Sequence, residues 1–112
     1  MRDELDITPF AVIDSNAMEN AVRQMEDAVR QIVSGIGLGL AFDSHFVISQ
    51  ILKHDSDAYI HFAVPGDATN TMHGRIAELI RDSGLVVRME QEAWSDTIHG
   101  KPGTCALWRR TA

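Results

Sequence analysis

Apolar residues recur at three- and four-residue intervals between Met18 and Val33, which places them on one face of an α-helix. Asp14 or Ser15 can cap such a helix. We therefore predict an amphipathic helix over residues 15–34.

This helix also offers a seam for self-association. Met18, Met25 and Ile32 fit the a and d positions of a heptad repeat. Two heptads suit pairing with the same helix of a second copy, and they suit packing within one domain equally well. We predict a homodimer through this helix, and packing on its own domain is the alternative.

Glycine occupies every second position from Gly35 to Gly39 and ends the helix. The residues between the glycines are apolar. Neither Gly-x-Gly-x-x-Gly spacing nor a following Lys-Ser/Thr pair is present, so a phosphate-binding loop is not indicated. We predict a connection over residues 34–40 that packs against the core.

The middle of the chain predicts two more helices, each with an apolar stripe. Candidate caps are Asp43 or Ser44 for the first helix and Asp67, Thr69 or Asn70 for the second. The expected buried positions are Val47, Ile48, Ile51 and Leu52 in the first helix, and Met72, Ile76, Leu79 and Ile80 in the second. The second helix is expected to end before Gly84.

Residues 55–64, between these helices, fit two structures. Ala58, Ile60, Phe62 and Val64 alternate as they would in a half-buried strand. The same segment also fits a helix face, with Asp55 or Ser56 as its cap. Periodicity alone leaves both open.

The last part of the chain alternates with the period of two that is typical of strands. Residues 85–94 and 104–110 are strand-like and are joined by a turn-rich tip, so they predict a β-hairpin. Trp94 and Trp108 are expected to form its core rather than a base-stacking surface. Helices followed by such a hairpin predict an α+β fold, a winged-helix-like domain with an extra N-terminal amphipathic helix.

Composition bounds the domain organisation. The chain has 112 residues, 45% of them hydrophobic and 23% charged, which is typical of one globular domain. We predict an N-terminal arm over residues 1–14 and a single domain over residues 15–112. No signal peptide and no membrane-spanning run is evident, so we expect a cytoplasmic protein without a membrane partner.

Charge opposes general binding to nucleic acid, because ten basic side chains face sixteen acidic ones and the net charge is -6. The charge is uneven along the chain. Residues 1–43 hold three basic and eight acidic side chains, whereas residues 70–112 hold six basic and five acidic ones. A basic face on the C-terminal half is therefore compatible with the sequence.

Three stretches carry a resemblance to other proteins. They are Phe42-Asp43-Ser44-His45, His73-Gly74-Arg75-Ile76, and Gly100 followed by Ala106-Leu107-Trp108-Arg109-Arg110. With them, residues 42–110 resemble a group of small uncharacterised bacterial and phage-like proteins of winged-helix appearance. The resemblance implies a short helix at residues 55–64 and a hairpin ending in Trp-Arg. It implies no activity and does not extend to residues 1–41.

In a winged helix, the helix before the hairpin would enter the major groove of double-stranded DNA. The expected nucleic-acid-binding residues are Asn70, Thr71, Arg75 and Arg81 on that helix, with Lys101, Arg109 and Arg110 on the hairpin. Glu78 shares the outer face with Arg75, so the alternative for the two helix arginines is solvation or pairing with Glu78 and Asp82.

No motif in the sequence specifically indicates a catalytic or a metal-binding site. None of the five histidines has another histidine four residues away, and Cys105 is the single cysteine, so we predict no metal site and no cofactor. No nucleophile elbow is present, and an enzyme is not expected. The predicted function is a winged-helix, transcription-regulator-like module that binds nucleic acid. The alternative is a non-catalytic protein-interaction or assembly module of the same fold.

Overall fold

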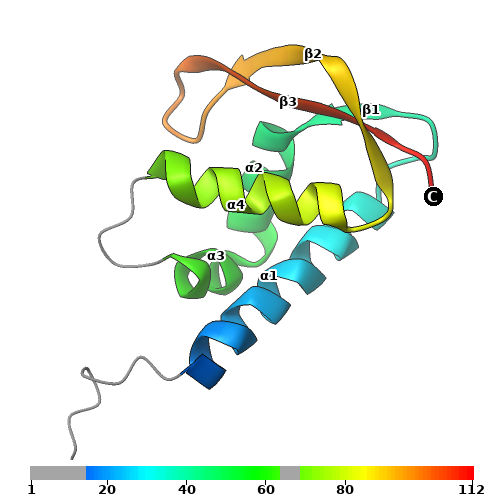
Figure 1. Ribbon diagram of the computed structural model, residues 1–112. Helices are drawn as coiled ribbons and strands as arrows, with labels where there is room; N and C mark the ends of the chain where they lie inside the picture. Colours follow the sequence, from blue (N-terminus) through cyan, green and yellow to red (C-terminus); the bar gives the residue numbers. More distant parts are fainter. Residues whose placement is uncertain (1–14, 64–68) are drawn as a thin grey trace, which may run out of the picture.

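A computed structural model describes residues 15–63 and 69–112 of the chain, so the predicted arm over residues 1–14 lies outside the described residues. The described residues form an α+β fold with four helices and one three-stranded antiparallel sheet (Figure 1). In chain order the elements are α1 (Ser15–Ser34), β1 (Ala41–Asp43), α2 (Ser44–His54), α3 (Ser56–Phe62), α4 (Thr69–Asp82), β2 (Val86–Asp96) and β3 (Pro102–Arg110). The sheet lies along one side of the molecule, and the helices gather on the other side.

The predicted N-terminal helix is confirmed as α1, and it packs within its own domain. Met25, Ala28, Val29 and Val33 belong to the hydrophobic core. Met25 is 0% exposed, so its predicted place in a dimer interface is wrong: its side chain is already covered by its own domain. Of the other two predicted interface residues, Met18 is exposed and Ile32 is partly buried.

The starts of α2 and α3 follow from two aspartate caps. Asp43 accepts a hydrogen bond from the backbone N–H of Phe46 at 2.7 Å, and Asp55 accepts one from that of Ala58 at 3.3 Å. The segment that fitted both a strand and a helix is therefore helical over Ser56–Phe62, while Val64 lies outside the described residues.

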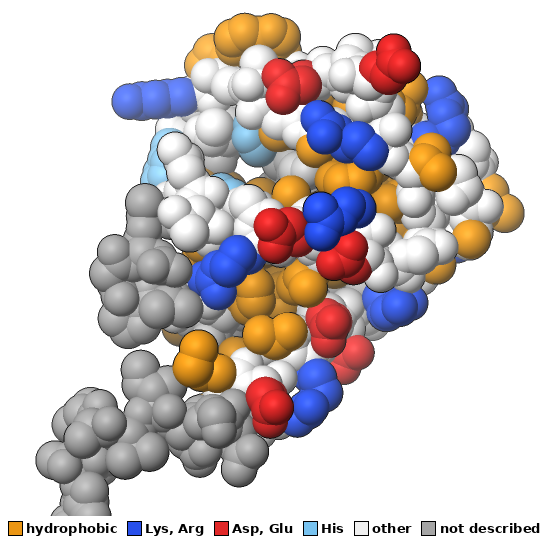
Figure 2. Space-filling view, viewed as in Figure 1, with side chains coloured by type: hydrophobic (Ala, Val, Ile, Leu, Met, Phe, Trp, Pro, Cys, Tyr) orange, Lys and Arg blue, Asp and Glu red, His pale blue; other side chains and the backbone are white. Residues whose placement is uncertain are grey.

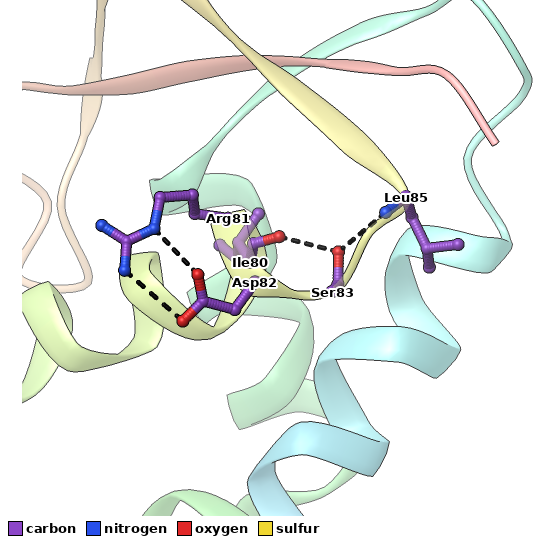
Figure 3. Close-up of polar contacts among 5 residues, drawn as sticks. All are labelled: Ile80, Arg81, Asp82, Ser83 and Leu85. Carbon is purple, nitrogen blue, oxygen red and sulfur yellow. Dashed lines mark hydrogen bonds and ion pairs between the residues drawn. The ribbon is translucent and has the colours of Figure 1, made fainter.

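The predicted helix before the hairpin is confirmed as α4, with Met72, Ile76 and Ile80 buried. The Ser83 hydroxyl donates to the Ile80 carbonyl at 2.7 Å and accepts from the Leu85 backbone N–H at 3.2 Å, which closes the end of the helix (Figure 3). Gly84 follows with φ +77°, a conformation that favours glycine. This turn directs the chain straight into β2.

The sheet has the order β1-β3-β2, so the last strand lies in the middle. The predicted hairpin is confirmed as β2 and β3, whereas the short strand β1 was not predicted. The register of β2 against β3 shifts, because Arg88 pairs with Trp108 while Glu92 pairs with Ala106. Strand β2 thus holds two more residues than β3 across this interval, a break that regular alternation did not reveal.

The two tryptophans of the hairpin have different environments. Trp108 is 3% exposed, and its Nε1–H donates to the Ser44 Oγ at 2.9 Å, which ties β3 to the start of α2. Trp94 is 73% exposed, so its predicted place in the hairpin core is wrong. It lies beyond the register shift, in the half of β2 that leads into the hairpin loop, where it pairs with Thr104.

The hydrophobic core lies between the helices and the sheet. Phe42, Trp108 and the buried faces of the helices form it. None of the helices in the described part of the chain combines the length and the apolar character that crossing a bilayer requires.

Candidate functional site

Three of the predicted nucleic-acid-binding residues lie at one end of the molecule. Asn70 and Thr71 are exposed in the first turn of α4, and Lys101 is exposed in the β2–β3 loop. That loop is closed by a hydrogen bond of 2.8 Å from the Thr97 N–H to the Lys101 carbonyl. Asn70 lines a hollow that Thr97 also lines, so the start of α4 and the loop are neighbours. Figure 1 shows the loop above the start of α4.

Arg75 points toward α3 rather than outward. One of its Nη atoms donates to the Phe62 carbonyl at 3.3 Å, and its guanidinium lies 4.6 Å from the centre of the Phe62 ring. The side chain is only partly exposed. Its predicted position on the outer face is therefore wrong, because α3 provides both a carbonyl and an aromatic face for the guanidinium.

Arg81 is exposed but paired with its neighbour, which is the alternative that the sequence left open. Its Nε donates to Asp82 at 2.9 Å and one Nη donates at 3.4 Å (Figure 3). The hydrogen bond from Arg81 lowers the pKa of the Asp82 carboxyl. Eleven residues separate Arg81 from Asn70, which is about 16 Å along a helix axis.

Arg109 and Arg110 hold the connection between α1 and β1. Arg109 donates to the Gly39 carbonyl at 2.6 Å. One Nη of Arg110 donates to the carbonyls of Val33, Ser34 and Ile36, at 3.3, 3.1 and 2.5 Å. A cation at the C-terminal end of a helix is favourable. The predicted set therefore does not form one surface.

Three of the five histidines line the same hollow, although their spacing in the sequence did not predict it. His45 from α2, His73 from α4 and His99 from the β2–β3 loop line one hollow of about 470 Å³. The sequence separations of 28 and 26 residues exclude a local motif. The available signal was the resemblance, because two of its three stretches contain His45 and His73.

Hydrogen bonds position two of these imidazoles. His45 Nδ1 lies 2.7 Å from the Ser95 Oγ, and His73 Nε2 lies 2.9 Å from the Tyr59 hydroxyl. Burial lowers the pKa of His73, and the nearby His45 and His99 lower it further. Burial also raises the pKa of Tyr59, so its hydroxyl keeps its proton.

Two kinds of chemistry can be assessed at this hollow. An imidazole on a serine hydroxyl is the contact by which a base activates a nucleophile, but no described carboxylate hydrogen-bonds to His45 to complete a triad. Within residues 15–63 and 69–112, no group of three or more His, Cys, Asp or Glu side chains is placed to hold a metal ion.

A second feature is an apolar patch beside a groove that α1 and α2 form between them. Leu38 is 69% exposed and Leu40 59% exposed, so the predicted packing of this connection against the core is wrong for both residues. Phe46 and Ile36 line two adjoining hollows here, of about 500 and 440 Å³. We refer to Ile36, Leu38, Leu40 and Phe46 as the apolar patch.

The charged surface is mixed in sign. Figure 2 shows Lys and Arg side chains interleaved with Asp and Glu on the face in view, without a continuous basic area. Comparison of the chain with protein-family profiles, with curated proteins and with solved structures returned no match.

Proposed function

We propose that the protein is a winged-helix module that binds duplex DNA through the start of α4 and the β2–β3 loop. The order of its elements carries this proposal. Strand β1 stands between α1 and α2, α4 leads directly into the hairpin, and the sheet order is β1-β3-β2. This order supports a winged-helix arrangement, in which the helix before the hairpin would face the major groove and the hairpin loop would contact the DNA backbone.

The exposed start of α4 suits close approach to DNA. Asn70 and Thr71 offer an amide and a hydroxyl, and open space surrounds the position of a Cβ at Gly74. The backbone N–H groups at a helix N-terminus favour a phosphate. Lys101 adds a cation from the loop. Arg75, Arg81, Arg109 and Arg110 are engaged elsewhere, so this surface is smaller than the sequence predicted.

The net charge of -6 limits the affinity of the protein for DNA. With one lysine at the contact, we expect the logarithm of the binding constant to fall with the logarithm of salt concentration with a slope of only about -1 to -2. Binding is therefore expected at low salt and to be weak at physiological salt.

Fluorescence anisotropy with a labelled random duplex tests this proposal. Lys101→Gln is expected to weaken binding and to reduce the salt slope by about 1. Lys53→Gln is the matched control, because Lys53 is the only other lysine and lies exposed at the far end of α2. Absence of binding at low salt, or equal effects of the two variants, would contradict the proposal.

A second candidate function, assembly through self-association, is favoured by one observation. Leu38, Leu40 and Phe46 of the apolar patch are exposed, and Ile36 and Phe46 of the patch line both adjoining hollows. Exposed apolar areas of this kind mark interaction surfaces. A second copy is the occupant that this candidate specifies.

A further inference from the structure

The hollow between α2, α4 and the hairpin differs in composition from the rest of the protein. Three of the five histidines line it, together with the amide of Asn70 and the hydroxyls of Thr97 and Thr104. No Asp or Glu is among its described lining residues, although the chain has sixteen acidic side chains and ten basic ones. The described lining therefore offers imidazole, amide and hydroxyl groups without a carboxylate, a composition that suits an anion.

Two of the imidazoles use one ring nitrogen each for a hydrogen bond to another described residue. His45 contacts Ser95 through Nδ1, and His73 contacts Tyr59 through Nε2, so among the described residues Nε2 of His45 and Nδ1 of His73 are left for a ligand. The hydroxyls of Ser95 and Tyr59 can each donate to the nitrogen that they contact, and the other nitrogen then carries the proton. His99 lies in the exposed loop and completes the cluster.

The N-terminal end of α4, which lines the hollow, has the electrostatic polarity that suits an anion. Thr69 and Asn70 line the hollow and form the first turn of α4, whose N-terminus carries the positive end of the helix dipole. A volume of about 470 Å³ is in the range of small-molecule sites.

We propose that this hollow binds a phosphate group, with His45, His73 and His99 as donors. The group can belong to a small phosphorylated molecule or to a nucleic-acid backbone, since both present the same tetrahedral oxyanion. The inference goes beyond DNA binding, because inorganic phosphate alone is sufficient to test it.

Imidazole proton and nitrogen shifts of the full-length protein provide the first measurement. Inorganic phosphate and then pyrophosphate are added at constant ionic strength. Signals of His45, His73 and His99 are expected to move along one saturable curve, while those of His54 and His61, which do not line the hollow, stay in place. Absence of shifts with both anions, or similar shifts at all five histidines, would overturn the proposal.

Matched variants provide the second measurement. His99→Gln removes a loop imidazole and is expected to weaken phosphate binding about tenfold, the loss that corresponds to one charge-assisted hydrogen bond. His54→Gln on α2 is expected to bind as the wild type does, since His54 is exposed outside the hollow. Equal phosphate affinities of the two variants would also overturn the proposal.

Competition with duplex DNA then identifies the source of the phosphate. DNA that displaces inorganic phosphate from the histidine signals points to a nucleic-acid backbone. Phosphate binding without competition points to a small phosphorylated molecule and would leave the hollow assigned even if DNA binding failed.

Discussion

The surroundings of His73 favour its neutral form. Among the described residues, the titratable groups near it are Tyr59 from α3, His45 from α2, His99 from the loop and Cys105 from β3. None of these is a carboxylate that would stabilise an imidazolium, and burial together with the two other histidines lowers the pKa of His73. The unfolded chain therefore binds a proton on this residue more readily than the folded chain does.

We accordingly expect the free energy of unfolding to fall as the pH decreases. The loss begins near the unfolded histidine pKa of about 6.5 and is complete below the lowered folded value. Urea unfolding at about pH 7.5 and about pH 5.5 measures it. His73→Gln is expected to reduce the difference and His61→Gln to preserve it. Equal stability of the wild type at the two pH values would contradict this expectation.

Arg75 illustrates why single residues were harder to predict than helices. Its position on the amphipathic pattern of α4 placed it outside, yet its guanidinium lies over Phe62. Phe62 belongs to α3, the very segment for which the sequence allowed both strand and helix. The direction of the Arg75 side chain could not be predicted while the sequence left the structure of residues 55–64 undecided between strand and helix.

At the scale of elements, Arg110 joins the end of β3 to the end of α1. Its guanidinium donates to the carbonyls of Val33 and Ser34 in the last turn of α1 and of Ile36 just after it, 74 to 77 residues earlier in the chain. The Val33 carbonyl also accepts from the Ile36 backbone N–H at 3.0 Å. Carbonyls at the end of a helix lack successive N–H partners within the helix, so a charged donor helps to satisfy them.

Arg110→Met is expected to lower the free energy of unfolding by about 1.5 to 3 kcal/mol, because charged hydrogen bonds to these carbonyls are lost. Chemical denaturation measures the change. Arg30→Met, on the exposed face of the same helix, is the control and should cost far less. A loss of the same size in both variants would show that Arg110 has no such role.

Long periodic segments and their caps could be predicted from sequence, and short or long-range features could not. Helices α1, α2 and α4 repeat an apolar stripe over three or more turns, so local pattern was sufficient. Strand β1 has three residues and exists through its pairing with β3, which begins 59 residues after β1 ends. The histidine hollow likewise depends on three distant elements meeting.

At the scale of the whole molecule, the apolar patch and the histidine hollow share α2. Ser44 and His45 at its start line the hollow, whereas Phe46 and Gln50 line the groove against α1. A partner on the patch would therefore leave the hollow accessible, so assembly and ligand binding are compatible.

For self-association, we expect light scattering to give a dimer for the wild type and a monomer for the Leu38→Ser/Leu40→Ser variant at equal concentration. The reason is the loss of exposed apolar area that a second copy would cover. Ile60→Ser/Val87→Ser removes comparable exposed apolar side chains from α3 and β2 and should remain dimeric. A monomeric wild type would exclude the second candidate function.

The register shift in β2 has a consequence for the behaviour of the protein at high concentration. Strand β2 is an eleven-residue edge of the sheet, and a long regular edge is a template to which further chains can add. Two extra residues between Arg88 and Glu92 interrupt its row of hydrogen-bonding groups, and the 4.0 Å ion pair between these two side chains spans the interruption. The opposite edge, β1, has only three residues. We therefore expect both borders of the sheet to resist the addition of further strands, even though β2 itself exposes the apolar side chains of Val87 and Trp94.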